Sequence, residues 1–219
     1  MIIDWKKIDT VLLDMDGTLL DLNFDNHFWK EFVPLNFAKK QGLSIAEAKQ
    51  QLQPRFKSME GKLEWYCLDY WSAALELDIA GLKAEISGLI SVLPHVTEFL
   101  EKVHQSPKKV YLVTNAHRNS LDLKMDKTCL QGFFDDIISS HDLGFAKEHS
   151  EFWRLLQQQQ GFEKQTTLMI DDSLAVLDAA RQFGVAHLIS VSRPDSQQPK
   201  KEITTYPAIE DFRELMAGL

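Results

Sequence analysis

The second half of the sequence alternates short apolar runs with amphipathic stretches, and this alternation most narrows the folds open to the chain. Strand-like runs such as "KVYLVT" (109–114), "TLMI" (167–170) and "AHLISV" (186–191) are separated by helical patterns of about ten residues. Strands that alternate with helices form βαβ units, whose strands lie parallel in one sheet. With a further buried strand at 11–13, the sequence predicts an α/β fold with a Rossmann-like, doubly wound parallel sheet.

A long segment of helical character separates the first strand from the others. This segment covers residues 22–93 and ends before Pro94, which stops its last predicted helix. We therefore expect two domains: an α/β core made of residues 1–21 and 94–219, and a helical cap segment, residues 22–93, inserted after the first strand.

The pattern within each part predicts individual helices. A capping-box pattern beginning at Ser44 marks a helix start, and Pro54 is expected to break or kink that helix. The spacing of apolar residues predicts one amphipathic helix with an aromatic face over 63–75 and another helix over 79–93. A short helix is expected to close the chain at 209–216.

Composition excludes several functional classes. Apolar residues make up 44% of the chain, charged residues 26%, and the net charge is −8, which argues against nucleic acid as a partner because phosphate backbones need a basic surface. No apolar run is long enough to span a bilayer, and the N-terminus lacks a signal-peptide pattern. We expect a cytoplasmic protein without a membrane partner. The two cysteines and seven histidines show no metal-ligand spacing, and we expect reduced thiols.

Polar side chains stand where the predicted strands end. In an open parallel sheet, ligands bind outside the carboxyl ends of the strands, so these side chains are expected to meet in one site. The residues concerned are Asp14, Asp16, Thr114, Asn115, Lys147, Asp171 and Asp172.

This set of residues suits phosphoryl chemistry with a divalent cation. Carboxylates that share one point suppress each other's ionisation unless a cation lies among them, and an all-oxygen site favours Mg²⁺. A lysine supplies a positive charge for phosphate, and a threonine hydroxyl can donate a hydrogen bond to it. One carboxylate can attack phosphorus, while a second moves a proton.

The same residues resemble the four motifs of the haloacid dehalogenase-like (HAD) phosphohydrolases. "DMDGT" (14–18), "LVTN" (112–115), "GFAK" (144–147) and "MIDDS" (169–173) occur in the family's order and cover the whole chain. The resemblance implies that Asp14 is the nucleophile and Asp16 the general acid/base. It implies that Thr114 binds the phosphoryl group, with Asn115 beside it, and that Lys147 neutralises charge. It also implies a Mg²⁺ site of Asp14, Asp16, Asp171 and Asp172.

Two positions depart from the family pattern. Many relatives have Gly-Asp where this chain has Asp171 and Asp172, so the resemblance leaves open whether Asp171 binds the metal directly or stands behind it. Glu148 replaces the proline that often follows the lysine.

The inserted segment resembles the family's helical C1-type cap. Within it and before it, "LLDMDGTLLDLNFDNHFW" (12–29) and "LEWYCLDYWS" (63–72) resemble the GMP/IMP 5′-nucleotidase branch. That resemblance implies a purine nucleoside monophosphate as substrate. The aromatic stripe of Tyr66, Tyr70 and Trp71 is interpreted as cap core, which leaves Trp65 and Asp69 as substrate-facing candidates.

Other functions remain open from the sequence. Within the family, the alternative is a phosphatase for a sugar phosphate or phosphoglycolate. Outside it, the alternative is a phospho-accepting regulatory protein or a non-catalytic phosphate-binding protein. His117 and Arg118 follow the second motif and either approach phosphate or form an exposed helix start. The sequence does not indicate the oligomeric state.

Overall fold

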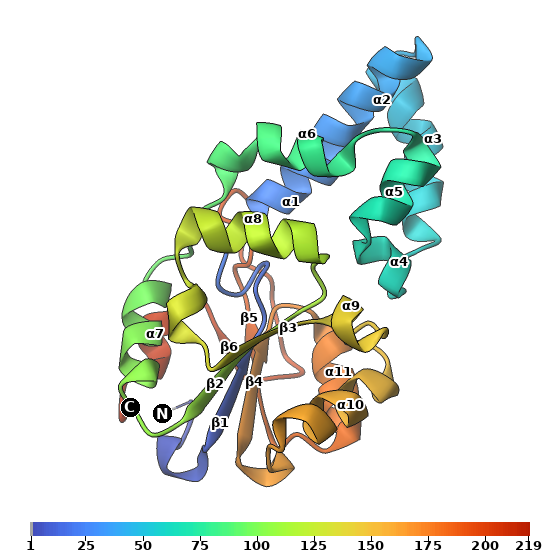
Figure 1. Ribbon diagram of the computed structural model, residues 1–219. Coiled ribbons are helices and arrows are strands. Elements are labelled where there is room, and N and C mark those ends of the chain that lie inside the picture. The colour runs from blue at the N-terminus through green and yellow to red at the C-terminus, as the bar shows by residue number, and fades with distance from the viewer. Residues whose placement is uncertain (1) are drawn as a thin grey trace.

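A six-stranded parallel sheet forms the centre of the computed structural model, which describes residues 2–219 (Figure 1). The strand order is β3-β2-β1-β4-β5-β6, and every neighbouring pair is parallel. This confirms the predicted doubly wound sheet. The strands are β1 (Thr10–Leu13), β2 (Lys109–Thr114), β3 (Asp136–Ser139), β4 (Thr167–Asp171), β5 (His187–Val191) and β6 (Ala208–Ile209).

Helices cover both faces of the sheet because the strand side chains alternate between two apolar cores. Val11 and Leu13 of β1 face the core that holds α7 (Val96–His104), while Leu12 faces the core that holds α10 (Ser150–Gln160) and α11 (Leu174–Phe183). Figure 1 shows α7 on one side of the sheet and α10 and α11 on the other. The remaining core helices are α8 (Arg118–Thr128), α9 (Ser140–Leu143) and the short 3₁₀ turns η1 (Trp5–Lys7), η4 (Gln131–Phe133), η5 (Lys164–Thr166) and η6 (Phe212–Leu215).

The cap segment has an apolar core of its own, which includes Phe28, Leu52 and Trp71. Figure 1 shows α2 to α5 extending away from the sheet, while α1 and α6 lie nearest to α8. Its elements are α1 (Asn23–His27), the π-helical turn η2 (Phe28–Phe32), α2 (Val33–Gln41), α3 (Ile45–Lys57), α4 (Leu63–Tyr66), α5 (Leu68–Leu75), α6 (Ile79–Glu85) and η3 (Ser87–Leu89).

Several helix predictions were wrong in detail. Pro54 lies inside α3, which continues to Lys57; the ring of Phe56 packs edge-on against Trp29, Trp65 and Trp71, so tertiary packing holds the last turn. The predicted helix over 63–75 is interrupted at Cys67, whose backbone is extended and whose side chain caps α5 by accepting from the Tyr70 N–H.

Shorter elements replace two other predicted helices, and one short strand was not predicted. The helix predicted over 79–93 ends at Glu85 and gives way to the 3₁₀ turn η3, and the closing helix at 209–216 is the 3₁₀ turn η6. Strand β6 has only two residues, too few to produce a sequence pattern, and was not predicted. Within residues 2–219, none of the helices has the length and apolar character that crossing a membrane requires.

Candidate active site

Three neighbouring strands, β2, β1 and β4, carry the predicted site residues at their carboxyl ends. Thr114 is the last residue of β2, Asp14 directly follows β1, and Asp171 is the last residue of β4. Because β1 lies between the other two in the sheet, residues far apart in the sequence come together at one edge. All three side chains are buried.

Lys147 lies at the centre of this edge and is 1% exposed. Its ammonium group lies 2.6 Å from Asp14 Oδ1 and 2.7 Å from Asp171 Oδ2, and it donates to the Val113 carbonyl at 2.9 Å. Burial opposes the lysine's charge, but the two carboxylates outweigh this effect and raise its pKa. The lysine is therefore a fixed cation between Asp14 and Asp171.

Side chains and backbone around Lys147 fix its position. Its backbone N–H donates to Asn115 Oδ1 at 2.9 Å, and Trp153 Nε1 donates to its carbonyl at 2.7 Å. The next residue, Glu148, accepts hydrogen bonds from Asn115 Nδ2 at 3.0 Å and from the Tyr66 hydroxyl at 2.6 Å. Glu148, at the position that departs from the family pattern, thus links the core to the cap segment.

Asp14, Asp171 and Asp172 form an acidic cluster in which one carboxylate oxygen of each lies within 4.8 Å of the others. Burial and the neighbouring charge of Asp14 raise the pKa of Asp172 to about 7, and burial also raises that of Asp171. Such crowding of carboxylates is unfavourable without a cation, and three hard oxygen ligands fit Mg²⁺. The residues present therefore fit the metal that the sequence predicted.

Gly17 allows Asp172 to approach the loop after β1. Its φ is +85°, and a Cβ at this position would lie 2.7 Å from Asp172 Cγ. Only glycine satisfies both the left-handed backbone and the close approach.

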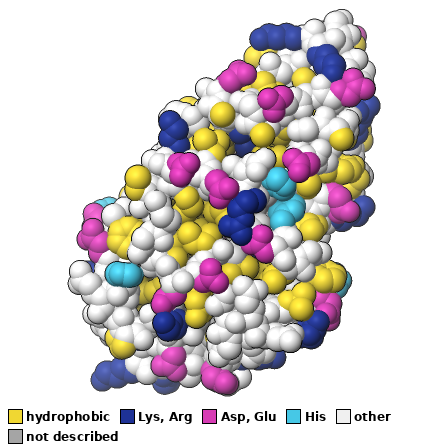
Figure 2. Space-filling model, viewed as in Figure 1, with side chains coloured by type: hydrophobic (Ala, Val, Ile, Leu, Met, Phe, Trp, Pro, Cys, Tyr) yellow, Lys and Arg dark blue, Asp and Glu magenta, His cyan; other side chains and the backbone are white. Residues whose placement is uncertain are grey.

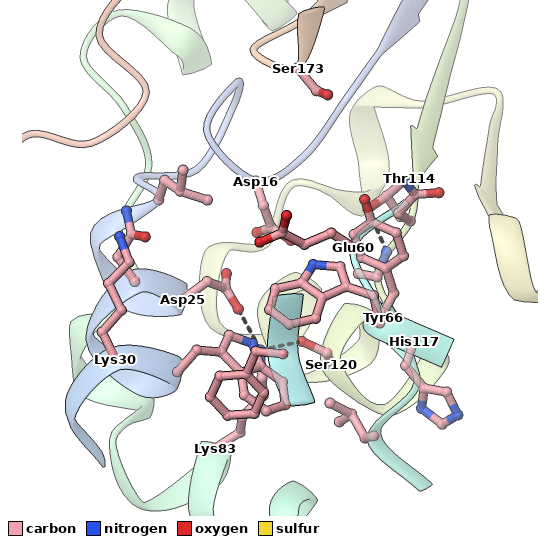
Figure 3. Close-up of a pocket in the computed structure, with 18 of the residues that line it drawn as sticks. Asp16, Asp25, Lys30, Glu60, Tyr66, Lys83, Thr114, His117, Ser120 and Ser173 are labelled. Atoms are coloured by element: carbon pink, nitrogen blue, oxygen red, sulfur yellow. Dashed lines mark hydrogen bonds and ion pairs between the residues drawn. The ribbon is translucent and has the colours of Figure 1, made fainter. Parts of the chain in front are cut away.

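Asp16 belongs to a second buried network that sequence reasoning missed. Lys124 of α8 bridges Asp16 Oδ1 and Asp25 Oδ2, at 2.6 Å to each. Lys83 of α6 lies 2.5 Å from Asp25 Oδ1 (Figure 3). Lys83 also donates to Ser120 Oγ at 3.2 Å. Both lysines are almost fully buried. Each lysine lies on the apolar face of a predicted helix, and this position was the feature of the sequence that could have revealed it.

Burial sets the protonation of Asp16. It raises the pKa of the carboxyl group to about 6, because the loss of solvation outweighs the attraction of Lys124. A carboxyl group with this pKa exchanges its proton near neutral pH, as a general acid and base must.

A cavity of about 720 Å³ extends from the acidic cluster into the cap segment. At its far end Trp29 and Trp65 lie with ring centroids 6.0 Å apart and planes 29° apart, and Phe56 packs edge-on against both. Figure 3 shows Asp16 and Asp25 on one wall of the cavity and Tyr66 and Thr114 on another. The cavity therefore joins a charged end to an aromatic end.

The structure brings most predicted site residues into this cavity. Those that line it are Asp14, Asp16, Trp65, Thr114, Asn115, Lys147, Asp171 and Asp172. Asp69 does not line the cavity; its side chain is 77% exposed and its Oδ2 lies 3.6 Å from His117 Nε2. His117 lines the cavity, whereas Arg118 forms an ion pair with Asp142. Trp71 lies in the core of the cap segment as expected. Tyr66 was expected in the same core but lines the cavity.

Comparisons with known proteins agree with this arrangement. Residues 8–184 match the family model of the haloacid dehalogenase-like hydrolases. The chain is 40% identical over 217 residues to the GMP/IMP nucleotidase YrfG of Escherichia coli K12, covering 99% of this chain and 98% of that protein. It is 27% identical to the pyrophosphatase PpaX of Oceanobacillus iheyensis over 76% of each chain. Among solved structures, a HAD phosphatase from Thermococcus onnurineus superposes with a TM-score of 0.79 at 22% identity, covering 95% of this chain and 96% of that one.

Proposed function

Since the chain is a phosphatase that belongs to the haloacid dehalogenase-like hydrolases, we propose that it removes the 5′-phosphate from GMP and IMP in a Mg²⁺-dependent reaction. The observation that carries the proposal is the 40% identity over nearly the whole chain to a GMP/IMP nucleotidase. A cavity with a phosphate-suited end and an aromatic end supports it, because aromatic rings stack on a purine base.

The metal site consists of Asp14, Asp172 and the backbone carbonyl of Asp16, with Asp171 behind them. Asp171 Oδ1 already accepts from the Ser173 N–H at 2.9 Å, and its Oδ2 accepts from Lys147. Asp172 has only a long contact of 3.4 Å to Lys201, so its oxygens are freer to bind a cation. When bound, Mg²⁺ supplies positive charge to the phosphoryl oxygens.

In the first step an oxygen of Asp14 attacks phosphorus, and the bond from phosphorus to the ribose 5′-oxygen breaks. Asp16 donates its proton to that leaving oxygen, which produces the nucleoside and an aspartyl-phosphate on Asp14. The Thr114 hydroxyl and Lys147 hold the phosphoryl group and neutralise its charge.

In the second step Asp16 acts as a base. It takes a proton from a water molecule as the water oxygen attacks phosphorus, which releases phosphate and regenerates Asp14 and protonated Asp16. The pKa of about 6 suits both directions of proton transfer.

The cap segment recognises the nucleoside part of the substrate. The Trp29 and Trp65 rings are too close for a base to enter between them, so we propose that the purine stacks on the cavity side of Trp65. Asp69 lies outside the cavity and would need to move to contact the substrate. With nucleotides as substrates, a cytoplasmic location fits the proposal.

A substrate panel tests the proposal. Purified protein with Mg²⁺ is assayed for phosphate release from GMP, IMP, AMP, phosphoglycolate, sugar phosphates and pyrophosphate, with and without EDTA. We expect GMP and IMP to give the highest kcat/KM and EDTA to abolish turnover. A preference for a sugar phosphate or phosphoglycolate would refute the nucleotide assignment. Stoichiometric phosphorylation or phosphate binding without turnover would favour a regulatory or binding role.

A further inference from the structure

A second group of metal-binding side chains lies outside the acidic cluster. Cys67, His117 and His141 each offer one ligand atom, and these atoms lie within 4.8 Å of one another. Cys67 lies between α4 and α5 in the cap segment, His117 directly precedes α8, and His141 belongs to α9. The spacing in the sequence gave no sign of this group, because its members come from three separate elements.

Two imidazole nitrogens in this group are buried and have no hydrogen-bond partner among residues 2–219. These are His117 Nδ1 and His141 Nε2, and the two rings meet edge-on with centroids 5.0 Å apart. Buried polar atoms in proteins are rarely left without a partner, so an unsatisfied pair calls for an explanation. Cys67 Sγ accepts a hydrogen bond from the Tyr70 N–H at 3.4 Å, an ordinary length for sulfur, and it keeps further lone pairs for a cation.

Asp69 contacts the other nitrogen of His117. Its Oδ2 lies 3.6 Å from His117 Nε2, on the opposite side of the ring from the unpartnered Nδ1. Histidines that bind metals commonly donate their second N–H to a carboxylate, which fixes the tautomer and orients the ring. Asp69 lies at ion-pair rather than hydrogen-bond distance from Nε2, and this side of the ring leaves Nδ1 free as a ligand.

We propose that Cys67, His117 and His141 bind one zinc-class cation that ties the cap segment to the core. A thiolate with two imidazoles selects a borderline-soft ion such as Zn²⁺, whereas the all-oxygen cluster selects Mg²⁺. Three protein ligands leave a fourth position for water. Figure 2 shows histidine side chains gathered between the two parts of the molecule on this face.

Because the site lies between the cap segment and the core, a bound cation affects turnover. Cys67 moves with the cap segment, whereas His117 lines the cavity and stays with the core. A cation bound by all three residues holds the cap segment against the core, and so it slows any opening that substrate entry or product release requires.

Cobalt titration tests the binding site directly. Metal-free protein in excess Mg²⁺, which fills the acidic cluster, is titrated with Co²⁺ and followed by its thiolate-to-metal charge-transfer absorption. We expect one Co²⁺ per chain with this absorption, its loss in Cys67→Ser, and its retention in Cys129→Ser, which changes the exposed second thiol. His141→Gln should weaken binding by about tenfold or more. No such absorption in the wild type, or its persistence in Cys67→Ser, would overturn the site.

Two further measurements test the ion's role. Zn²⁺ should displace Co²⁺ and raise the melting temperature of the wild type and of Cys129→Ser, but not of Cys67→Ser. Zn²⁺ should also slow phosphatase turnover in the wild type and leave Cys67→Ser unaffected. Equal inhibition of both would place zinc at the acidic cluster and overturn the proposed link between cap segment and core.

Discussion

Asp14 and Asp16 are chemically similar residues in different surroundings, and we propose a different role for each. Asp14 Oδ1 lies 2.6 Å from the ammonium group of Lys147, and we propose Asp14 as the nucleophile. Partial burial of Asp16 removes enough solvation to raise its pKa to about 6 despite its own lysine partner. The proposed two-step phosphoryl transfer requires one carboxylate to attack phosphorus and a second carboxyl group to move a proton.

Asp14→Asn removes the nucleophile while keeping the shape of the side chain. We expect turnover to fall by about a thousandfold or more, because the amide oxygen cannot form the covalent intermediate. Phosphate-release assays measure the loss, and circular dichroism checks that the variant is folded. A folded variant with substantial turnover would contradict the assignment of Asp14.

Gly17→Ala tests the close approach of the loop to Asp172. The added Cβ would lie 2.7 Å from Asp172 Cγ, so Asp172 must shift, and Mg²⁺ affinity should fall by about tenfold or more. The matched control is Gly42→Ala, which has a similar positive φ but open space around it. Both variants should lose about 1 kcal/mol of stability, and only Gly17→Ala should lose Mg²⁺ affinity in a titration. Equal Mg²⁺ affinities would show that the contact is unimportant.

Helix α8 carries one lysine on its buried side and another on its exposed side. Lys124 pairs with Asp16 and Asp25 inside the protein, whereas Lys127 is exposed. The helix therefore places a cation beside the proposed general acid through its buried face. Lys83 of α6 and Lys124 of α8 both form ion pairs with Asp25, so these helices are held together by charge as well as by packing.

Lys124→Met should destabilise the protein by about 3 kcal/mol, because it leaves buried carboxylates without their partner. Lys127→Met on the same helix should change stability by about 0.5 kcal/mol or less. Urea unfolding of both variants beside the wild type measures the difference. Lys124→Met should also raise the pKa of Asp16, because it removes the neighbouring positive charge. The activity that depends on ionised Asp16 should therefore move to higher pH. Similar stabilities for both variants would mean that the network is energetically neutral.

The molecule as a whole is held together across its cavity by this same network. Asp25 lies in the cap segment, and its two lysine partners come from the cap segment and the core. The helices α1 to α6 fall within residues 22–93, although the exact domain boundaries stay a prediction.

The charge of Asp25 predicts how overall stability depends on pH. Burial opposes ionisation, but Lys124 and Lys83 outweigh it and hold the pKa well below 3.8. The folded state then binds this proton less readily than the unfolded state, so the stabilisation is complete above the unfolded pKa and is lost as pH falls below it. The difference in unfolding free energy between the wild type and Asp25→Asn should therefore shrink from about pH 5 to about pH 3. A constant difference in urea titrations would contradict this reading.

The sequence determined the order of strands and helices, and with it the residues at the strand ends. Periodicity is a local property, so β1, β2, β4 and the polar residues that follow them could be located before any contact was known. The detailed helix ends could not, because Pro54 and Cys67 depend on packing around Phe56 and on capping. Tertiary structure alone decided which distant side chains meet. It joined Asp16 to Lys124, 108 positions away, placed Asp69 outside the cavity, and brought Cys67 to two core histidines. Such contacts follow from how elements pack in space, which no spacing along the chain records.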